Sequence, residues 1–452
     1  MKFKIDRVYT STLFQIAIPI AIQNGINALL TMTDILMIGQ LGSISVAAAA
    51  LANQVAFLLT FFMYGVTSGA VAFTAQFWGK KDITSIRKVL GICLALCLLM
   101  AVIFTLIAEF LPSAALGLYT EDRSVIELGT RYLQIVGISY IFSAVSFSYS
   151  SVLKGMGRVQ IPMLVSIAAL SLKAILSYIL IFGSFGVPAQ GIIGGAIGTL
   201  AARVVEFFLM LLIVYLRRMP IAAKLPELLT FNRKFVTSYL KIALPVVFNE
   251  MLWSLGVSIY TGIYAHISTE AIAAVNIATS IESLAFVLLI ANSDAGGIMT
   301  GNMIGAGDEN MAYIYARRML ILATGIGVLV GGIILAISGF YPELYQVSPQ
   351  VRSDARAIMV IMGSIFWIRG SNMTLIVGVM RNGGDTRFSA LIDIGTVWLV
   401  GIPLALLGVY LLQAPIWTVY LLVMGDEISK YLIGLRRFIS RRWIHNLAHI
   451  GA

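Results

Sequence analysis

Carboxylate, amide and ammonium groups stand inside long apolar stretches of this 452-residue sequence, where such side chains are uncommon. The first stretch contains "QIAIPIAIQNGINALLTMTDILMIG" and holds Asn24, Asn27 and Asp34. Asn27 and Asp34 are two helical turns apart, so they share one face of a helix. A charged side chain at the centre of a bilayer costs roughly 2.5 to 3.5 kcal/mol on insertion scales. We therefore expect these residues to be paired or to face a water-filled cavity.

Further ionisable residues occur in the apolar stretches of both halves of the chain. They are Lys173, Arg203, Glu206, Glu250, Glu282, Asp294, Arg369, Asp393, Asp426, Glu427 and Lys430. The last three are expected near the cytoplasmic surface, with solvated side chains that reach toward water. Burial favours the neutral form of a carboxyl group and a nearby cation favours its charged form. A buried carboxylate that is exposed in turn to the two sides of a membrane can therefore bind and release a cation.

Other chemistries find little support in the sequence. Cys93 and Cys97 lie one helical turn apart, and two thiols alone make no metal site, so we expect no bound metal. The three histidines all lie outside the apolar stretches, and the chain has no GxxxxGK[ST] phosphate-binding loop. We expect neither an enzyme nor a pump that hydrolyses ATP, and no organic cofactor.

The elements that must position these groups are membrane-spanning helices. The sequence is 59% hydrophobic and 12% charged, against about 25% charged residues in soluble domains. Several apolar stretches reach the roughly 20 residues that an α-helix needs to cross a bilayer. The predicted spans are 12–38, 46–78, 88–111, 128–153, 162–183, 191–216, 238–265, 272–304, 315–339, 356–380, 388–411 and 415–435.

The basic residues predict the orientation of these spans. The N-terminus, the tail and the loops after even-numbered spans carry 23 Lys and Arg, whereas the opposite loops carry four. By the positive-inside rule both termini are cytoplasmic, and we expect a multi-pass protein of the inner (cell) membrane. This one-sided pattern accounts for the net charge of +10 without a nucleic-acid partner.

An internal repeat relates the two halves of the chain. At a shift of 226 residues "QIAIPIAIQN" matches "KIALPVVFNE", and Asp82 matches Asp308. At a shift of 227, "LKGMGRVQ" matches "MRNGGDTR". Six spans are thus used twice, and an even number of spans gives both halves the same orientation. We predict an all-α membrane protein with twelve transmembrane helices in two six-helix lobes, related by a pseudo-two-fold axis along the membrane normal and enclosing a central cleft.

The domain boundaries follow from the repeat and from a polar stretch between the halves. The stretch "RRMPIAAKLPELLTFNRKF" carries two prolines and five basic residues. The predicted domains are an N-terminal lobe 1–216, a cytoplasmic linker 217–237, a C-terminal lobe 238–435 and a basic cytoplasmic tail 436–452.

These motifs together resemble one transporter family. "IAIPIAIQNGINALLTMTDILMIGQLG", the partners "AQFWGKKD" and "GNMIGAGD", and the closing "LRRFISRRW" are similar to the multidrug and toxic compound extrusion (MATE) transporters over nearly the whole chain. The pattern is most similar to the bacterial branch of the DNA-damage-inducible type. The resemblance implies that Asp34 is the carboxylate that binds the coupling cation.

The fifth span departs from the family pattern. Related members carry an Asn and, four residues later, an Asp, where this chain has Lys173 and Ser177 in "LKAILSYILIFG". Thr199 in "GAIGTLAA" still matches the remaining polar ligand. An ammonium group in place of oxygen ligands is a poor cage for Na⁺. We predict that Lys173 takes the place of the cation beside Asp34, although it could instead reach the membrane interface without a role.

The second half departs from the family as well. Glu250 follows Pro245 by five residues, whereas many drug-exporting relatives carry a Glu about one turn later, where this chain has Trp253. Arg369 stands at or near an Asp of another branch, whose second cation site is therefore absent. The residues predicted for the substrate cleft are Asn24, Asn27, Arg203, Glu250, Trp253, Asp294 and Arg369.

The resemblance favours a monomeric secondary antiporter that works by alternating access. It would export amphipathic or cationic small molecules in exchange for H⁺ or, failing that, Na⁺, among membrane lipids. The alternative is a flippase or exporter of an anionic lipid-linked substrate, because the apolar stretches hold Lys173, Arg203 and Arg369. The two hypotheses differ in whether these cations are free to meet a substrate or are paired with carboxylates.

Overall fold

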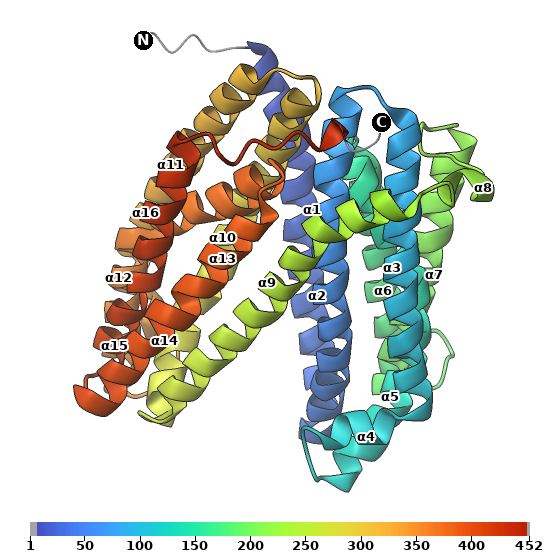
Figure 1. Cartoon of the computed structure of the whole chain (residues 1–452). Helices are drawn as coiled ribbons and strands as arrows, with labels where there is room; N and C mark the ends of the chain where they lie inside the picture. Colours follow the sequence, from blue (N-terminus) through green and yellow to red (C-terminus); the bar gives the residue numbers. More distant parts are fainter. Residues whose placement is uncertain (1–6, 450–452) are drawn as a thin grey trace. The chain divides into compact units, whose positions relative to one another are not determined.

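The computed structural model describes residues 7–449 (Figure 1). Within this range the chain forms helices and connecting loops, with no strand. Lys2 and Lys4 of the basic start, and the last three residues of the predicted tail, lie outside the described residues. The prediction of an all-α protein is confirmed.

The chain forms two compact units. Of the described residues, 22–243 form the first unit, and 7–21 together with 244–449 form the second. The sequence placed the boundary between its two lobes in residues 217–237 instead. The predicted lobes follow the sequence repeat, whereas the boundaries of the two compact units fall at other residues.

Both divisions between the units fall inside long helices that contain a proline. Helix α1 (Arg7–Gly39) contains Pro19, and α9 (Arg233–Ala265) contains Pro245. Each helix continues past its proline, which is tolerated in membrane helices because neighbouring groups satisfy the freed backbone carbonyls. The two helices have the same length, 33 residues, as the repeat requires.

Five long helices follow α1 in the first unit. They are α2 (Ser43–Gly79), α3 (Ile83–Phe110), α5 (Arg123–Gly155), α6 (Gln160–Phe182) and α7 (Ile192–Leu216). Helix α5 packs against α2, α3 and α7, and α6 packs against α7. Figure 1 shows the short α4 (Pro112–Gly117) at the turn from α3 to α5, and α8 (Leu225–Leu228) in the connection that leads to α9.

The second unit repeats this arrangement with more interruptions. Its α-helices after α9 are α10 (Thr269–Gly305), α11 (Glu309–Ile337), α12 (Pro349–Met373), α13 (Thr386–Thr396), α14 (Ile402–Leu406), α15 (Ile416–Val423) and α16 (Gly425–Ile439). Between them lie the π-helical segments η2 (Thr374–Arg381), η3 (Val397–Gly401) and η4 (Leu407–Leu411) and the short 3-10 turns η1 (Tyr341–Leu344) and η5 (Leu447–His449). The π-helical segments were not predicted, and such segments occur mostly at functional sites.

The repeat is visible in the helix ends. Helices α2 and α10 both have 37 residues. After α2, Asp82 caps α3 by accepting a hydrogen bond from the amide of Ser85, at 3.0 Å. After α10, Asp308 caps α11 in the same way from the amide of Met311, at 2.9 Å. These two aspartates are matched in the sequence repeat, so the repeated motif forms the same turn twice.

The predicted spans correspond to helices of the structure. Among the described residues, ten helices are long and apolar enough to cross a membrane, and α10 is the eleventh if its two bent parts count as one span. The predicted twelfth span is formed by α15 and α16, which are separated only by Met424. This span is not among the ten because neither helix alone is long enough to cross a membrane, since α15 has 8 residues and α16 has 15. The chain thus has the fold of a twelve-helix membrane protein.

Candidate functional site

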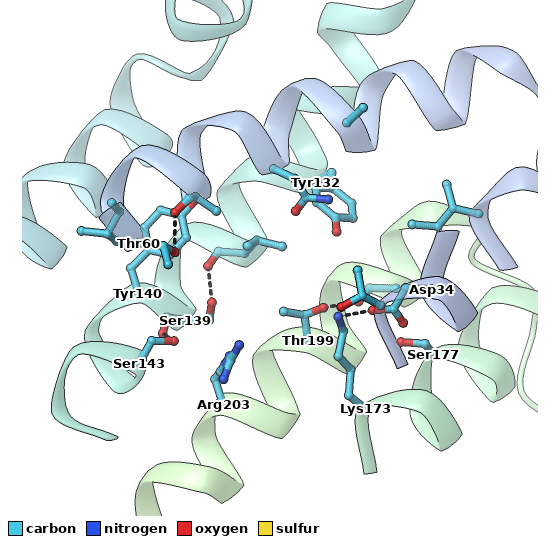
Figure 2. A pocket seen from close by; sticks show the side chains of 18 of the residues that line it. Asp34, Thr60, Tyr132, Ser139, Tyr140, Ser143, Lys173, Ser177, Thr199 and Arg203 are labelled. Atoms are coloured by element: carbon cyan, nitrogen blue, oxygen red, sulfur yellow. Dashed lines mark hydrogen bonds and ion pairs between the residues drawn. The ribbon is translucent and has the colours of Figure 1, made fainter. Parts of the chain in front are cut away.

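The first unit contains a cavity of about 480 Å³ between α1, α2, α5, α6 and α7 (Figure 2). Apolar and polar side chains both line it. The polar ones are Thr31, Asp34, Asn53, Thr60, Tyr132, Ser139, Tyr140, Ser143, Lys173, Ser177, Thr199 and Arg203. All four residues predicted for cation coupling are therefore brought together in one cavity.

An ion pair across two helices is the central feature of this cavity. Lys173 on α6 donates a hydrogen bond from Nζ to Oδ2 of Asp34 on α1. The side chain of Lys173 is 25% exposed and that of Asp34 is 20% exposed, so neither charge is sealed off from the cavity. Figure 2 shows the two side chains meeting between the helices. The predicted position of Lys173 beside Asp34 is confirmed as geometry, while its coupling role stays a prediction.

Ser177 and Thr199 lie next to this ion pair. Ser177 is one turn after Lys173, is 1% exposed, and its hydroxyl has no hydrogen-bond partner in the described part of the chain. Its Oγ would lie 2.7 Å from a Cβ placed on Gly198, so α6 and α7 approach closely at this small residue. The hydroxyl of Thr199 donates to the carbonyl of Gly195 at 3.0 Å. Both hydroxyls therefore face the cavity with their lone pairs still able to accept.

Arg203, predicted for the substrate cleft, lines the same cavity. Its Nη1 lies 2.6 Å from Oε2 of Glu206, one turn further along α7. The Arg203 side chain is 35% exposed, whereas that of Glu206 is 12% exposed. The guanidinium group therefore enters the cavity already neutralised by a buried carboxylate.

Sequence reasoning missed the contribution of α5. Tyr132, Ser139, Tyr140 and Ser143 line the cavity from this helix (Figure 2). Tyr140 is 4% exposed, and its hydroxyl has no partner in the described part of the chain. Tyr132 is separated from Ser139 and Tyr140 by about two helical turns, and Ser143 follows one turn later, so the four residues lie on one face of α5. This polar stripe on an apolar span was the signal that could have found them.

The two asparagines of α1 do not join this cavity. Asn24 and Asn27 belong to the first unit and are half-buried, but neither is among the residues that line it. The carbonyl of Asn27 accepts a hydrogen bond from the hydroxyl of Thr31, which does line it. Their predicted role in a substrate cleft stays a prediction.

The predicted cleft residues of the second half lie in the second unit, where they have different surroundings. Glu250 on α9 accepts from Arg381 at 2.8 Å, and the Arg381 side chain is only 4% exposed. Trp253, one turn further along α9, is 38% exposed. Asp294 on α10 is half-buried.

Arg369, also predicted for the cleft, is a structural cation in this arrangement. Its Nη1 lies 2.5 Å from Glu282 of α10, and its Nε lies 3.6 Å from Glu427 of α16. The arginine side chain is 18% exposed and also lies over the ring of Phe286, 5.4 Å from its centroid. Arg369 thus bridges two carboxylates from two helices.

The expectation for the charges of α16 is wrong. Asp426, Glu427 and Lys430 were expected near the cytoplasmic surface with solvated side chains, yet Asp426 and Lys430 are each 4% exposed. Lys430 pairs with Asp393 of α13 at 2.8 Å, and Asp393 also accepts from Asn249 at 2.9 Å. Lys430 and Glu427 have charged partners on neighbouring helices, Asp393 and Arg369, which a reading of one span alone does not reveal.

This geometry defines what each region can do chemically. In the first unit one carboxylate and one ammonium group meet at a cavity, and protonation of Asp34 would remove the attraction that holds Lys173. In the second unit, Arg369 lies between two carboxylates, and Asp393 accepts from both Lys430 and Asn249. The ion pair of the first unit thus borders a cavity, whereas these charges of the second unit link neighbouring helices.

Comparisons with known proteins agree with the fold and the repeat. The MatE family model matches residues 19–179 and 245–407 of this chain, one segment in each half. A relative in Bacillus subtilis, the uncharacterized transporter YisQ, is 25% identical over 438 residues, which cover 96% of this chain and 95% of the relative. The probable multidrug resistance protein NorM of Thermotoga maritima is 23% identical and covers 95% and 92% of the two chains.

Solved structures of such transporters share the fold. A mutant of the Vibrio cholerae MATE transporter VcmN has a TM-score of 0.87 with 19% identity and covers 96% of this chain and 97% of its own. A transporter of the MOP superfamily from Pyrococcus furiosus, described as having a binding pocket of reverse polarity, has a TM-score of 0.84 with 18% identity and the same coverage. At this identity the likeness shows the fold, and the chemistry must come from the residues of this chain.

Proposed function

Because this chain belongs to the MATE family of membrane transporters, we propose that it exports amphipathic or cationic small molecules in exchange for protons. Two of its relatives, from Agrobacterium fabrum and Thermotoga maritima, are named as probable multidrug resistance proteins, which supports this choice of substrates. The bacterial branch of the DNA-damage-inducible type stays a prediction from the resemblance.

The observation that carries the proposal is the Asp34–Lys173 pair at the cavity of the first unit. Lys173 supplies an internal cation that neutralises Asp34 when no proton is bound. Uptake of a proton by Asp34 would free Lys173, and release of that proton would restore the pair. A transporter can use such an exchange as its coupling step, because the two states of the pair differ in charge and in the position of a long side chain.

The same pair favours H⁺ over Na⁺ as the coupling ion. Na⁺ would need several oxygen ligands, but the place of two such ligands is taken by Lys173 and by the hydroxyl of Ser177. The Thr199 hydroxyl adds one weak acceptor. The Lys173 ammonium group beside the carboxylate would repel a metal cation, whereas a proton needs only one oxygen of Asp34.

The pairing of the buried cations argues against an anionic substrate. Lys173, Arg203 and Arg369 each lie against a carboxylate, namely Asp34, Glu206 and Glu282. A site for a lipid-linked anion would instead present cations that are free to meet it. We therefore keep cation export as the proposal and do not favour the flippase.

We further propose that the protein is a monomer in the inner membrane, among lipids, with both termini in the cytoplasm. The 23 basic residues on one side of the predicted spans support this orientation.

Transport in proteoliposomes tests the proposal. The purified protein is reconstituted, and the movement of a fluorescent organic cation such as ethidium is followed with a pH gradient or a Na⁺ gradient imposed separately. We expect a pH gradient to drive transport without Na⁺, and Asp34→Asn to abolish the response. Transport that follows a Na⁺ gradient at equal pH on both sides would contradict proton coupling.

A further inference from the structure

The second unit buries a connected set of charged side chains that the proposed coupling site does not use. The set consists of the carboxylates of Glu250, Glu282, Asp393, Asp426 and Glu427 and the cations of Arg369, Arg381 and Lys430. Each cation has one carboxylate at 2.5 to 2.8 Å, which leaves two carboxylates in excess. A net negative charge inside a membrane protein is costly, so the set needs a further positive charge.

The two excess carboxylates, Glu427 and Asp426, differ in how well they are stabilised. Glu427 accepts a hydrogen bond from Asn372 at 2.6 Å, and its Oε1 lies 3.6 Å from Nε of Arg369. Asp426 is 4% exposed, accepts only from the hydroxyl of Tyr260 at 3.3 Å, and its Oδ1 has no partner. In the part of the chain that the structure describes, no Lys or Arg forms a direct ion pair with Asp426. Asp426 is therefore the carboxylate whose negative charge lacks a compensating cation among the described residues.

Ionisable side chains act on Asp426 from four helices: Tyr260 and Tyr264 of α9, Arg369 of α12, Tyr420 of α15, and Glu427 and Lys430 of its own helix. Gly401 of η3 also packs against Asp426 and brings no charge. From η2 and α13 the charged side chains are Arg381 and Asp393, which are engaged with Glu250 and Lys430. The cations of these helices are thus engaged with other carboxylates. A proton needs only one carboxylate oxygen, so it fits Asp426 better than a metal ion, which needs several oxygen ligands.

The internal repeat leads to the same place independently. At the shift of 226 that aligns α1 with α9, Tyr260 is the counterpart of Asp34. At the shift of 227 that aligns α7 with α16, Asp426 is the counterpart of Thr199. The second unit therefore carries its carboxylate on the last span instead of the first, with a tyrosine at the position of Asp34. Arg203 and Lys430 are counterparts at the same shift.

Contacts between the last two spans of each half confirm this register. Gly198 of α7 lies against Ser177 of α6. Their counterparts at a shift of 227, Gly425 and Leu404, also lie against each other, since a Cβ on Gly425 would be 2.9 Å from Cδ1 of Leu404. The correspondence of Asp426 with a residue of the Asp34 cavity is thus a structural one.

We propose that the second unit contains a proton-binding site of its own, formed by Asp426 and the Tyr260 hydroxyl, at the repeat-related position of the Asp34 site. The proton adds to the unpartnered Oδ1 of Asp426 and makes this carboxyl group neutral. The site is separate from the proposed Asp34–Lys173 coupling element and does not depend on it. Its role would be to hold a second proton while the first is exchanged.

Infrared spectroscopy of the purified full-length protein tests this site. A protonated carboxyl group has a carbonyl stretching band that shifts in D2O and disappears when the group ionises. The other carboxyl groups of the chain, Asp34 among them, contribute such bands at low pH too, so the spectra of wild type and Asp426→Asn are subtracted, and we expect one band of a protonated carboxyl group in the difference. Glu427→Gln is the matched control on the neighbouring residue and should keep the band. Asp34→Asn should also keep it, so failure of the proposed coupling site would leave this result unchanged.

Tyr260→Phe gives a second measurement if Asp426→Asn does not fold. Tyr260 gives the one hydrogen bond to this carboxyl group among the described residues, so its loss should shift the frequency of the band and the pH at which it disappears. A difference spectrum of wild type and folded Asp426→Asn without this band, or a band that is unmoved by Tyr260→Phe, would overturn the proposal. A wild-type spectrum without a protonated carboxyl band at any pH at which the protein stays folded would overturn it as well.

Discussion

The two units treat buried charge in opposite ways. In the first unit, Asp34 and Lys173 form a single pair beside a cavity, and their side chains are 20% and 25% exposed. In the second unit, Lys430 and Arg381 have side chains that are 5% and 4% exposed, within a set that joins α9, α10, α12, α13, η2 and α16. Both arrangements arise from the same six-helix repeat. The Asp34–Lys173 pair has one partner on each side and borders a cavity, whereas Arg369 and Asp393 each contact two partners and link helices of the second unit.

This difference teaches that buried charge in a transporter has two uses. Breaking a buried ion pair by removing one partner is strongly destabilising, because the other charge remains without compensation. For an ion pair at a cavity the loss of stability is smaller, because water can reach the charge that remains. Substitutions of single charged residues in the two units test this contrast through the free energy of unfolding.

Arg369→Ala should have the largest effect on stability. It leaves Glu282 and Glu427 without their shared cation, and we expect a loss of about 3 to 5 kcal/mol in the free energy of unfolding. Denaturant unfolding in detergent measures this loss. A loss below about 1 kcal/mol would show that the second unit is not held together by its charges.

Asp385→Asn should have a smaller effect that depends on pH. Asp385 lies at the start of α13, where it accepts from Arg437 at 2.8 Å and lies 3.6 Å from Nε2 of His445. Burial raises the pKa of Asp385, but the hydrogen bonds from His445 and Arg437 outweigh it and hold the pKa below its ordinary value. Hydrogen bonds to a charged group contribute about 1.5 to 3 kcal/mol, which the variant should lose at neutral pH.

The sign of this pH dependence follows from the lowered pKa of Asp385. The stabilisation is fully present above the pKa of an unfolded Asp, about 3.9, and is lost as the pH falls through the lower pKa of the folded protein. The difference in unfolding free energy between wild type and Asp385→Asn should therefore be constant near neutral pH and shrink below about pH 4. A difference that grows on acidification would contradict this account of the contact.

Lys173→Ala should destabilise the protein by only about 1 to 2 kcal/mol, because Asp34 can still be reached by water from the cavity. Its effect on transport should nevertheless be severe. Stability from denaturant unfolding and ethidium transport in liposomes, measured on the same preparation, separate the two effects. A loss of stability as large as that of Arg369→Ala would remove the distinction between the regions.

Arg131→Ala provides the lower end of the scale. Arg131 and Glu127 form a surface pair on α5 with side chains 68% and 75% exposed. Pairs of this kind contribute about 0.3 to 0.5 kcal/mol. Unfolding under the conditions used for Arg369→Ala should show a change of this size. A larger loss of unfolding free energy would mean that the effect of removing a charge does not depend on how deeply the ion pair is buried.

The sequence predicted the fold and part of the site for physical reasons that can be named. Long apolar stretches must form helices in a bilayer, and the match of Asp82 with Asp308 marks the same capped turn in both halves. Lys173 could be placed beside Asp34 because the family pattern puts cation ligands there. The polar stripe of α5 was missed, although its helical spacing was readable.

The rest could not be predicted because it depends on contacts between distant helices. Lys430 and Asp393 are on different helices, and nothing within "GDEISK" shows that the lysine has a buried partner. The three charges of α16 were therefore taken for solvated ones. The π-helical segments that shape α12 and α13 have no simple signal in residue type either.

The central claim is that Asp34 and Lys173 act as one coupling element. The most direct measurement is a double-mutant cycle on pH-driven ethidium transport in proteoliposomes with wild type, Asp34→Asn, Lys173→Ala and the double variant. We predict that each single change strongly lowers the rate of pH-driven transport and that the double variant is no worse than either, because the second change removes nothing further. Single variants that keep pH-driven transport, or losses that simply add in the double variant, would contradict the claim.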